Sequence, residues 1–354
     1  MNICFVNATH KWGGVKSWTL DVAQGLAEHG HDIIIAGRSG PFLDKATARG
    51  LETLALAFGP DFNPLLIIRL LRLFATRKTD LVVVNVGKDM RSAGVAARIL
   101  GIPVVHRVGL AGDMLNTWKV RLLHRWVRPH ILVPCHQIKT GLVQELPYLH
   151  SREISVILTG KKPVPAPPTT VHNPVRCVST SQLNADKGHA DVLLALAALK
   201  NQGHDFLYHI VGTGSSEAEL KALATRLQLD QHLVWHGFQA DVQAILRQAD
   251  VFLLPSYSEG LPNALLEAMA QGLVCVARDV GGVHEVWPDA APDLLLPATG
   301  TAQDCADILA DLLQRPGQEL AELRRVFWTA AAANTVDDMN TNVENYMRSL
   351  GKKQ

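Results

Sequence analysis

The chain has 354 residues, of which 47% are hydrophobic and 19% charged, with a formal net charge of +1. This length exceeds what one hydrophobic core usually serves, so the sequence predicts two domains. The near-zero charge disfavours a general nucleic-acid binder, and no apolar run approaches the length of a membrane span. Five isolated cysteines and the lack of an N-terminal signal pattern are typical of a cytoplasmic protein, and they predict neither a zinc site nor a disulfide framework.

Short apolar runs alternate with helical patterns from one end of the chain to the other. In the first half the runs occupy residues 2–7, 32–37, 80–86, 103–108 and 130–134, with helical patterns at 16–29 and 64–77. In the second half they occupy 175–181, 206–212, 232–237, 250–255 and 273–278. Strands that are apolar on both faces and alternate with helices are typical of parallel sheets covered by helices. The sequence therefore predicts an α/β fold with two doubly wound domains.

A proline-rich segment separates the two halves. Residues 160–174 contain five prolines, which cannot continue a helix or a central strand, so we interpret the segment as a semi-rigid linker. We expect an N-terminal Rossmann-like domain over residues 1–163, with C-terminal helices at about 326–354 packing back on it, and a second such domain over 164–325. Because ligands bind at the carboxyl ends of parallel strands, two facing domains of this kind would form a cleft.

The segment YSEGLPNALLEAM (257–269) places Glu259 and Glu267 eight residues apart, with no cation between them. It follows the predicted strand at 250–255, and Pro262 suits the first position of a helix. The first free amides of that helix, those of residues 263–265, would form an anion-binding N-terminus.

The two carboxylates would repel a phosphate, but each can accept two hydrogen bonds from a diol. Glu259 and Glu267 are separated by roughly the width of one diphosphate, given a rise of about 1.5 Å per helical residue. A ligand made of a sugar, a diphosphate and a ribose would fit. The alternative is structural, with Glu259 acting on the helix dipole and Glu267 solvated.

Here the sequence resembles a known family. EGLPNALLE (259–267) resembles the E-x7-E motif of retaining glycosyltransferases of the GT-B fold, in the large family 4-like group that includes lipopolysaccharide and mannosyl transferases. Further segments resemble other family motifs in the same order. These are HKWGGVKSWTLDVAQGLAEHGHDI (10–33), LNADKG (183–188), IVGTGSSEAEL (210–220), VWHGFQADV (234–242) and DVGGVHEV (279–286).

The resemblance implies roles for individual residues. Glu259 would contact hydroxyls of the donor sugar, Glu267 the ribose diol, and Lys187 the departing diphosphate. His106 would lie near the donor sugar, and Gly13 with Gly14 would form a loop that approaches the donor phosphates or the acceptor. The remaining donor-binding positions are Gln182, Gly212, Gly214, Gly260, Leu261, Asn263, Ala264, Leu265, Gly281, Gly282 and Glu285.

Several of these residues have simpler interpretations. Lys187 can be a solvated turn residue, His106 a core histidine bonded to a backbone carbonyl, and Gly13–Gly14 an ordinary turn. One position departs from the family pattern, because Gln182 stands where the family usually has an arginine. Glutamine donates hydrogen bonds but carries no charge, so either another cation substitutes, for which Arg278 and Lys16 are candidates, or turnover is slow or lost.

Metal and dinucleotide chemistry are not expected. The chain has no Asp-x-Asp pair, and its fifteen histidines follow no ligand pattern. VGTGSSE (211–217) imitates a dinucleotide fingerprint but has Glu217 in place of the third glycine. We therefore predict no metal and no cofactor other than the substrate, a UDP- or GDP-linked sugar.

Two basic amphipathic segments, at 65–78 and 115–128, lie in the first half. Such helices can lie on an anionic membrane surface, which would suit a glycan or lipid-linked acceptor at the inner face of a bacterial membrane. The alternative is ordinary packing on the sheet. Other functions that the sequence leaves open are a non-catalytic sugar-nucleotide binder, which Gln182 motivates, and a sugar-nucleotide epimerase.

Overall fold

The computed structural model describes residues 1–10, 13–150, 153–239 and 241–351. It divides into two compact units, Met1–Thr159 with Val336–Gln354, and Gly160–Thr335. The second unit thus begins at residue 160, whereas the sequence placed the boundary at 164. The helix Gly317–Ala332 also belongs entirely to the second unit, so the chain returns to the first unit at Val336 and not at about 326.

The first unit contains a parallel sheet of seven strands among its described residues, in the order β3-β2-β1-β4-β5-β6-β7. The strands are β1 (Asn2–Asn7), β2 (Asp32–Gly37), β3 (Glu52–Ala55), β4 (Leu81–Val84), β5 (Val104–Arg107), β6 (His130–Val133) and β7 (Ile154–Val156). The helices are α1 (Gly14–Glu28), α2 (Pro41–Ala48), α3 (Pro64–Thr76), α4 (Gly87–Asp89), η1 (Met90–Gly94), α5 (Val95–Ile99), η2 (Ala111–Asp113), α6 (Trp118–Val127), α7 (His136–Glu145) and α14 (Val336–Gly351).

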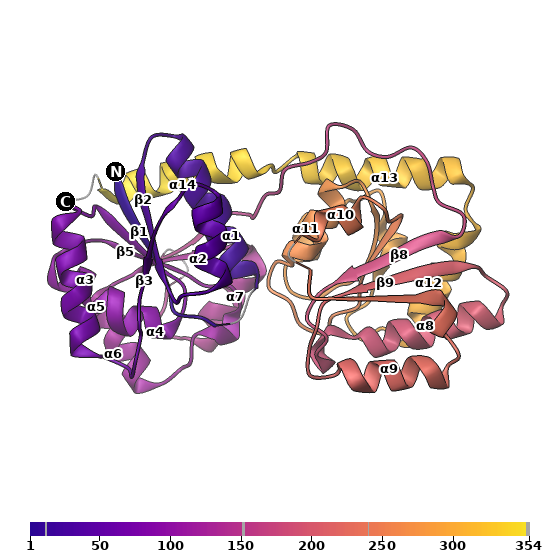
Figure 1. The fold of residues 1–354 in the computed structure, drawn as a ribbon, viewed down its shortest axis with the longest axis horizontal. Helices are drawn as coiled ribbons and strands as arrows, with labels where there is room; N and C mark the ends of the chain where they lie inside the picture. Colours follow the sequence, from indigo (N-terminus) through magenta and orange to yellow (C-terminus); the bar gives the residue numbers. More distant parts are fainter. Residues whose placement is uncertain (11–12, 151–152, 240, 352–354) are drawn as a thin grey trace. The chain divides into compact units, whose positions relative to one another are not determined.

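Alternate residues of β1, β2, β4 and β5 serve two separate cores, as the period of two in a strand requires. Ile3 and Phe5 of β1 pack with side chains of α1, α2 and α14. Cys4 and Val6 pack on the opposite face with side chains of α3, α5 and Val127 of α6. Both faces of the sheet are therefore covered, as the continuous apolar runs predicted (Figure 1).

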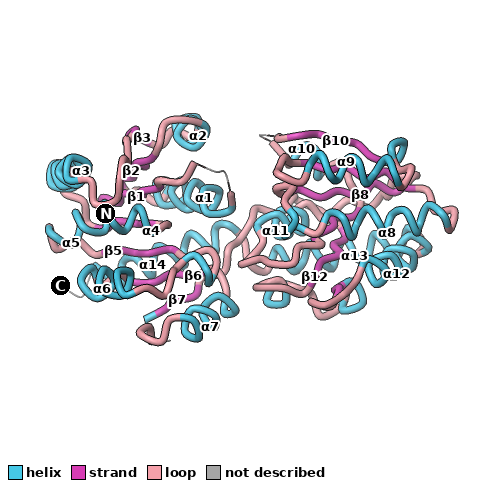
Figure 2. The backbone as a smooth tube through the Cα atoms, turned by 90° about the horizontal axis from the view of Figure 1, so that it is seen from below, coloured by secondary structure: helices cyan, strands magenta, loops and turns pink. Residues whose placement is uncertain are grey.

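The second unit repeats this plan with the strand order β10-β9-β8-β11-β12-β13. Its strands are β8 (Val175–Thr180), β9 (Phe206–Val211), β10 (Leu233–Gly237), β11 (Val251–Leu254), β12 (Val274–Arg278) and β13 (Leu295–Leu296). Its helices are η4 (Ala185–Lys187), α8 (His189–Asn201), α9 (Glu217–Arg226), η5 (Asp230–His232), α10 (Gln243–Leu246), α11 (Asn263–Ala270), η6 (His284–Val286), η7 (Pro292–Leu294), α12 (Ala302–Gln314) and α13 (Gly317–Ala332). Helices α8, α9 and α12 cover one face, and α10, α11 and α13 cover the other (Figures 1 and 2).

The predicted strands are confirmed to within about two residues at each end, whereas β3, β7 and β13 were not predicted. β7 and β13 contain three and two residues, too few to show a periodic pattern, and β3 (ETLA) contains no continuous apolar run. In both sheets the strand order reverses once, between β1 and β4 in the first unit and between β8 and β11 in the second. Ligands of doubly wound sheets bind at the carboxyl ends of the strands beside such a reversal.

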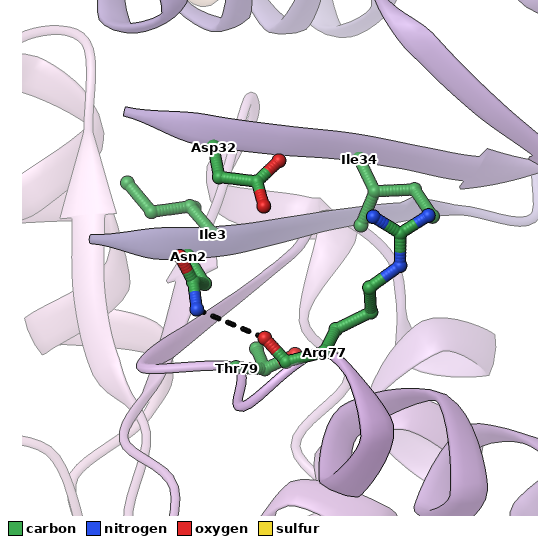
Figure 3. Close-up of a pocket in the computed structure, with 6 residues that line it drawn as sticks. All are labelled: Asn2, Ile3, Asp32, Ile34, Arg77 and Thr79. Carbon is green, nitrogen blue, oxygen red and sulfur yellow. Dashed lines mark hydrogen bonds between the residues drawn. The ribbon is translucent and has the colours of Figure 1, made fainter. Parts of the chain in front are cut away.

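A small pocket lies at the amino ends of β1 and β2, opposite the carboxyl ends of the strands in the first sheet (Figure 3). Asn2 donates from Nδ2 to the carbonyl oxygen of Arg77 across it, at 2.9 Å. Its place at the amino ends sets this pocket apart from the edge where ligands of such sheets bind. Within the described part of the chain, no helix is both long and apolar enough to cross a membrane.

Candidate functional site

The candidate site of the second unit is built from the two loops that follow β8 and β11. Lys187 ends the short helix η4 after β8, and its Nζ lies 2.7 Å from Oε1 of Glu259, in the loop after β11. The same Nζ donates to the carbonyl oxygen of Ser258 at 3.3 Å. Because β8 and β11 are adjacent at the strand-order reversal, these residues meet where a ligand is expected.

Helix α11 begins beside this ion pair. It runs from Asn263, with Pro262 as the residue that precedes it, so the predicted start at Pro262 is one residue early. Leu266 is the first residue whose amide reaches a carbonyl of this turn, that of Pro262. The amides of residues 263–265 precede the repeating pattern and have no acceptor within the helix. They form the electropositive end that the sequence predicted.

Each glutamate of the E-x7-E segment has a lysine partner, although no cation lies between the two in the sequence. Glu259 contacts Lys187, and Oε1 of Glu267 lies 3.3 Å from Nζ of Lys161. All four side chains are largely buried, with exposed fractions of 10–19%. The sequence could not show these pairs because each lysine is more than 70 residues away from its glutamate.

Two glycine pairs shape the loops around Lys187 and Glu259. Gly281 has a φ of +59°, and a Cβ there would lie 2.1 Å from the carbonyl oxygen of Glu259. Gly282 donates its amide to the carbonyl of Gly260. On the other side, a Cβ on Gly212 or Gly214 would overlap the backbone of residues 181–183. These glycines therefore allow neighbouring loops to touch through their backbones.

A fully buried arginine, Arg278 at the end of β12, anchors the loop that carries Glu259. Its guanidinium donates to the carbonyl oxygens of Pro255, Ala298 and Gly300 and to Oδ2 of Asp191 at 2.8 Å. It also lies over the ring of Tyr257, 4.5 Å from the centroid. The Tyr257 hydroxyl donates to the same Asp191 oxygen at 2.6 Å, and this hydrogen bond raises the pKa of Tyr257. We did not predict this anchoring role from the sequence.

Both residues proposed as substitutes for the missing arginine donate hydrogen bonds within their own units. Arg278 is occupied as described, and Lys16 is buried in the first unit, where Nζ donates to the carbonyl oxygens of Thr9 and His10. Burial lowers the pKa of Lys16. Gln182 itself accepts a hydrogen bond from Asn184 at 3.0 Å. The position beside Lys187 thus carries no positive charge of its own.

The remaining predicted residues of the second unit lie at the start of α11 and in η6. Leu261 is buried and Leu265 is fully buried, whereas Asn263 and Ala264 are partly exposed at the start of α11. Oδ1 of Asn263 is buried and has no hydrogen-bond partner among the described residues. Glu285 lies in η6, and its amide donates to the carbonyl of Gly282.

His106 lies inside the first unit, with only 3% of its surface exposed. Its ring meets that of His124 of α6 edge-on at 5.5 Å. Burial, and then the neighbouring His124, lower the pKa of His106 to about 3, so the ring is neutral. A hydrogen bond with the backbone of Asn85 opposes this shift. Burial and this backbone hydrogen bond are features of the core-histidine alternative, and a role of His106 beside the donor sugar stays a prediction.

Gly13 immediately precedes α1 in an extended conformation, and Gly14 opens the helix. A Cβ on Gly13 would meet nothing within 4 Å, so packing inside the chain does not require a glycine there. The role of both glycines beside a ligand stays a prediction. Residues 11–12 of the segment at 10–33, and residue 240 of the segment at 234–242, lie outside the described residues.

A buried carboxylate that the sequence analysis missed organises the strand-order reversal of the first unit. Asp89 is fully buried and accepts hydrogen bonds from the amides of Ala8, Asn85 and Val86 at 2.7–3.1 Å. Burial raises its pKa to about 7, against the effect of these amides. Asp89 thereby ties the loop after β1 to the loop after β4. No sequence signal distinguishes it from a surface aspartate.

Two protein-family models match the chain. The family model "Glycosyltransferase Family 4" matches residues 12–163, and "Glycosyl transferases group 1" matches residues 166–332. Together the two models match most of the chain. The chain belongs to the family 4-like glycosyltransferases of the GT-B fold.

Several curated relatives are similar to parts of the chain. The amylovoran biosynthesis glycosyltransferase AmsK of Erwinia amylovora is 38% identical over 152 residues, 41% of this chain and 37% of that protein. The putative colanic acid biosynthesis glycosyltransferase WcaL of Escherichia coli is 30% identical over 233 residues, 62% of this chain and 56% of that protein. The chain thus spans less than two thirds of the length of either relative.

Solved structures show the same fold at lower identity. A glycosyltransferase of Rickettsia africae has a TM-score of 0.82 at 17% identity, covering 100% of this chain and 99% of that one. Anabaena HepE, solved in complex with UDP and glucose, has a TM-score of 0.82 at 20% identity, covering 99% and 100%.

Proposed function

We propose that this protein transfers a sugar from a nucleoside-diphosphate sugar to a hydroxyl group of a glycan or lipid-linked acceptor, in the synthesis of a cell-surface polysaccharide. We further propose that the anomeric configuration is retained, that no metal or other cofactor takes part, and that the protein works in the cytoplasm. The names of its relatives, which include amylovoran and colanic acid biosynthesis glycosyltransferases, support the product class.

One arrangement carries this proposal, namely a carboxylate on either side of a helix N-terminus at the strand-order reversal. Glu259 precedes α11, and Glu267 lies on its second turn. The free amides of α11 attract a diphosphate, while the flanking carboxylates accept hydrogen bonds from the hydroxyls of the sugar and of the ribose. A nucleoside-diphosphate sugar has these three parts in this order.

The transfer needs stabilisation of the negative charge that develops on the departing diphosphate. Lys187 and the N-terminus of α11 provide it without rearrangement of the loops, because both are already fixed beside Glu259. As the bond to the sugar breaks, Lys187 exchanges part of its contact with Glu259 for the phosphate oxygens. Glu259 is then free to hold the sugar hydroxyls as the acceptor oxygen attacks.

Nucleotide binding is the first experiment. Thermal unfolding is followed with UDP, GDP and ADP and their common sugar conjugates, for the wild type and for Glu267→Gln. A nucleotide at a hundred times its Kd should stabilise the wild type by about 2.7 kcal/mol. We expect one nucleotide series to stabilise the wild type and to lose most of this effect in the variant. If no series stabilises a well-folded wild type, the proposal is wrong.

Retention of the anomeric configuration and independence of metal ions are tested by measuring the transfer reaction. We expect the product to have the anomeric configuration of the donor by NMR, and the rate to be unchanged by EDTA. An inverted product, or a rate restored only by Mg²⁺ or Mn²⁺, would refute these parts of the proposal.

The neutral Gln182 favours a second candidate, a sugar-nucleotide binder without catalysis. Introducing the missing charge with Gln182→Arg separates the two. If the wild type binds the nucleotide sugar but turns over only after this substitution, the non-catalytic function is correct. Conversion of a sugar nucleotide into its epimer, without any acceptor, would identify an epimerase instead.

We also propose that the first unit lies on an anionic membrane surface through α6. Trp118, Leu122 and Trp126 of this helix have exposed fractions of 70%, 60% and 45%. Between residues 114 and 144 the sequence has several lysines and arginines and no Asp or Glu. Apolar side chains flanked by cations match an anionic lipid surface. Sedimentation with vesicles containing phosphatidylglycerol should be lost in Trp118→Ser/Trp126→Ser, and equal sedimentation with neutral vesicles would contradict the proposal.

A further inference from the structure

Lys161 lies in the proline-rich segment, outside every motif that suggested a function. Its Nζ is nevertheless 3.3 Å from Oε1 of Glu267, and only 10% of the lysine side chain is exposed. The neighbouring Lys162 is exposed to solvent. The ion pair between Lys161 and Glu267 therefore differs from an ordinary surface ion pair between mobile side chains.

The backbone around Lys161 is held on both sides. At Gly160, a Cβ would lie 2.0 Å from the carbonyl oxygen of Thr335, so only glycine allows this approach. The amide of Val164 donates to the carbonyl of Ala270 in α11 at 2.9 Å. The carbonyl of Val164 accepts a hydrogen bond from Nε1 of Trp328 in α13 at 2.8 Å. The segment from 160 to 164 therefore runs along α11 in a fixed position.

A carboxylate held by one lysine still has acceptor capacity for a ligand. Lys161 contacts Oε1 of Glu267, which leaves Oε2 and the remaining lone pairs of Oε1 for other donors. A fixed carboxylate also loses less conformational freedom when it binds two hydroxyls at once. The ion pair thus prepares Glu267 for a vicinal diol.

We propose that Lys161 is a positioning residue of the nucleotide site, which orients Glu267 so that the site selects a ribose over a 2′-deoxyribose. This inference rests on the proposed function, in which Glu267 binds the ribose. It adds a residue that does not touch the donor but determines how strongly the 2′-hydroxyl is recognised. A site built to hydrogen-bond a hydroxyl discriminates against the analogue that lacks it.

The test compares dissociation constants for UDP and 2′-deoxy-UDP by calorimetry, with the GDP and ADP pairs used in the same way if one of these binds the wild type more tightly. The proteins are the wild type, Lys161→Met, Lys161→Arg and the control Lys162→Met. We expect the wild type to prefer the ribonucleotide, and Lys161→Met to reduce this preference by about 3- to 10-fold, the range for one hydrogen bond. Lys161→Arg and Lys162→Met should keep the preference within about twofold.

The ratio of the dissociation constants for the deoxyribonucleotide and the ribonucleotide distinguishes a positioning role of Lys161 from a merely structural one. If Lys161→Met weakens both nucleotides equally, or leaves the preference unchanged, the inference is wrong while the proposed function stands. If the wild type binds no ribonucleotide, the proposed function fails and this inference fails with it. Equal thermal midpoints of the free variants would show that a changed ratio does not come from partial unfolding.

Discussion

Replacement of Arg278 by methionine should destabilise the second unit and loosen the loop that carries Glu259. The guanidinium is fully buried and donates to three carbonyl oxygens and to Asp191. Methionine fills a similar volume but donates nothing, so these acceptors would remain buried without partners. Breaking a buried ion pair by removing one member costs about 3–5 kcal/mol.

The magnitude can be checked against a less buried arginine of the same unit, Arg315, whose side chain is 21% exposed. Arg315 also contacts two carboxylates, those of Asp293 and Asp311, but these side chains are 49% and 67% exposed. Pairs of this kind contribute about 0–1 kcal/mol, so Arg315→Met should cost no more than that. The difference in the free energy of unfolding between the two variants measures how much burial adds to the contribution of an arginine.

Urea unfolding followed by pulsed hydrogen exchange gives the free energy of each unit separately. We expect Arg278→Met to lower the free energy of unfolding for peptides of β11 and β12 by about 3–5 kcal/mol, with peptides of β4 unchanged. Nucleotide affinity should fall as well, because the backbone at Pro255 is held by this arginine. A loss below about 1 kcal/mol, equal to that of Arg315→Met, would refute the reasoning.

Two further predictions concern the packing of α14 against the rest of the first unit. Gly25→Ala would place a Cβ 1.9 Å from Nδ2 of Asn340, so we expect a loss of about 1–3 kcal/mol by urea unfolding, against little change for Gly112→Ala, whose Cβ meets nothing. Hydrogen bonds, first from His31, lower the pKa of Glu344 from 4.5 to about 2. Since the folded pKa is the lower one, the stabilisation is complete above pH 4.5 and is lost as the pH falls towards 2. Glu344→Gln should therefore differ from the wild type near neutral pH and converge with it in acid, and a constant difference across this range would contradict the assignment.

Local pattern was sufficient for most of the strands and helices. The strand at 250–255, the turn with Gly260 and the helix that ends before Gly272 are each determined by neighbouring residues, through apolar runs and turn chemistry. The structure confirms them as β11, the loop and α11. The place of Glu259 and Glu267 beside a helix N-terminus followed from the same local signals.

The partners of these side chains did not follow, because they come from distant parts of the chain. Lys161 is paired with Glu267 by the course of the linker along α11, and Arg278 is placed beneath Tyr257 by the order of the strands. For His106 the motif gave no measure of burial, and only the structure shows that the ring lies in the core.

The sequence by itself determined the two parallel α/β units and the carboxylates on either side of the N-terminus of α11, since periodicity and turn residues act over a few positions. Only the tertiary structure decided that both carboxylates are held by lysines, that Arg278 anchors the loop and that Asp89 joins two loops of the first unit. Burial and charge pairing depend on which segments the sheet brings together. That information is distributed over the whole chain, and no single motif contains it.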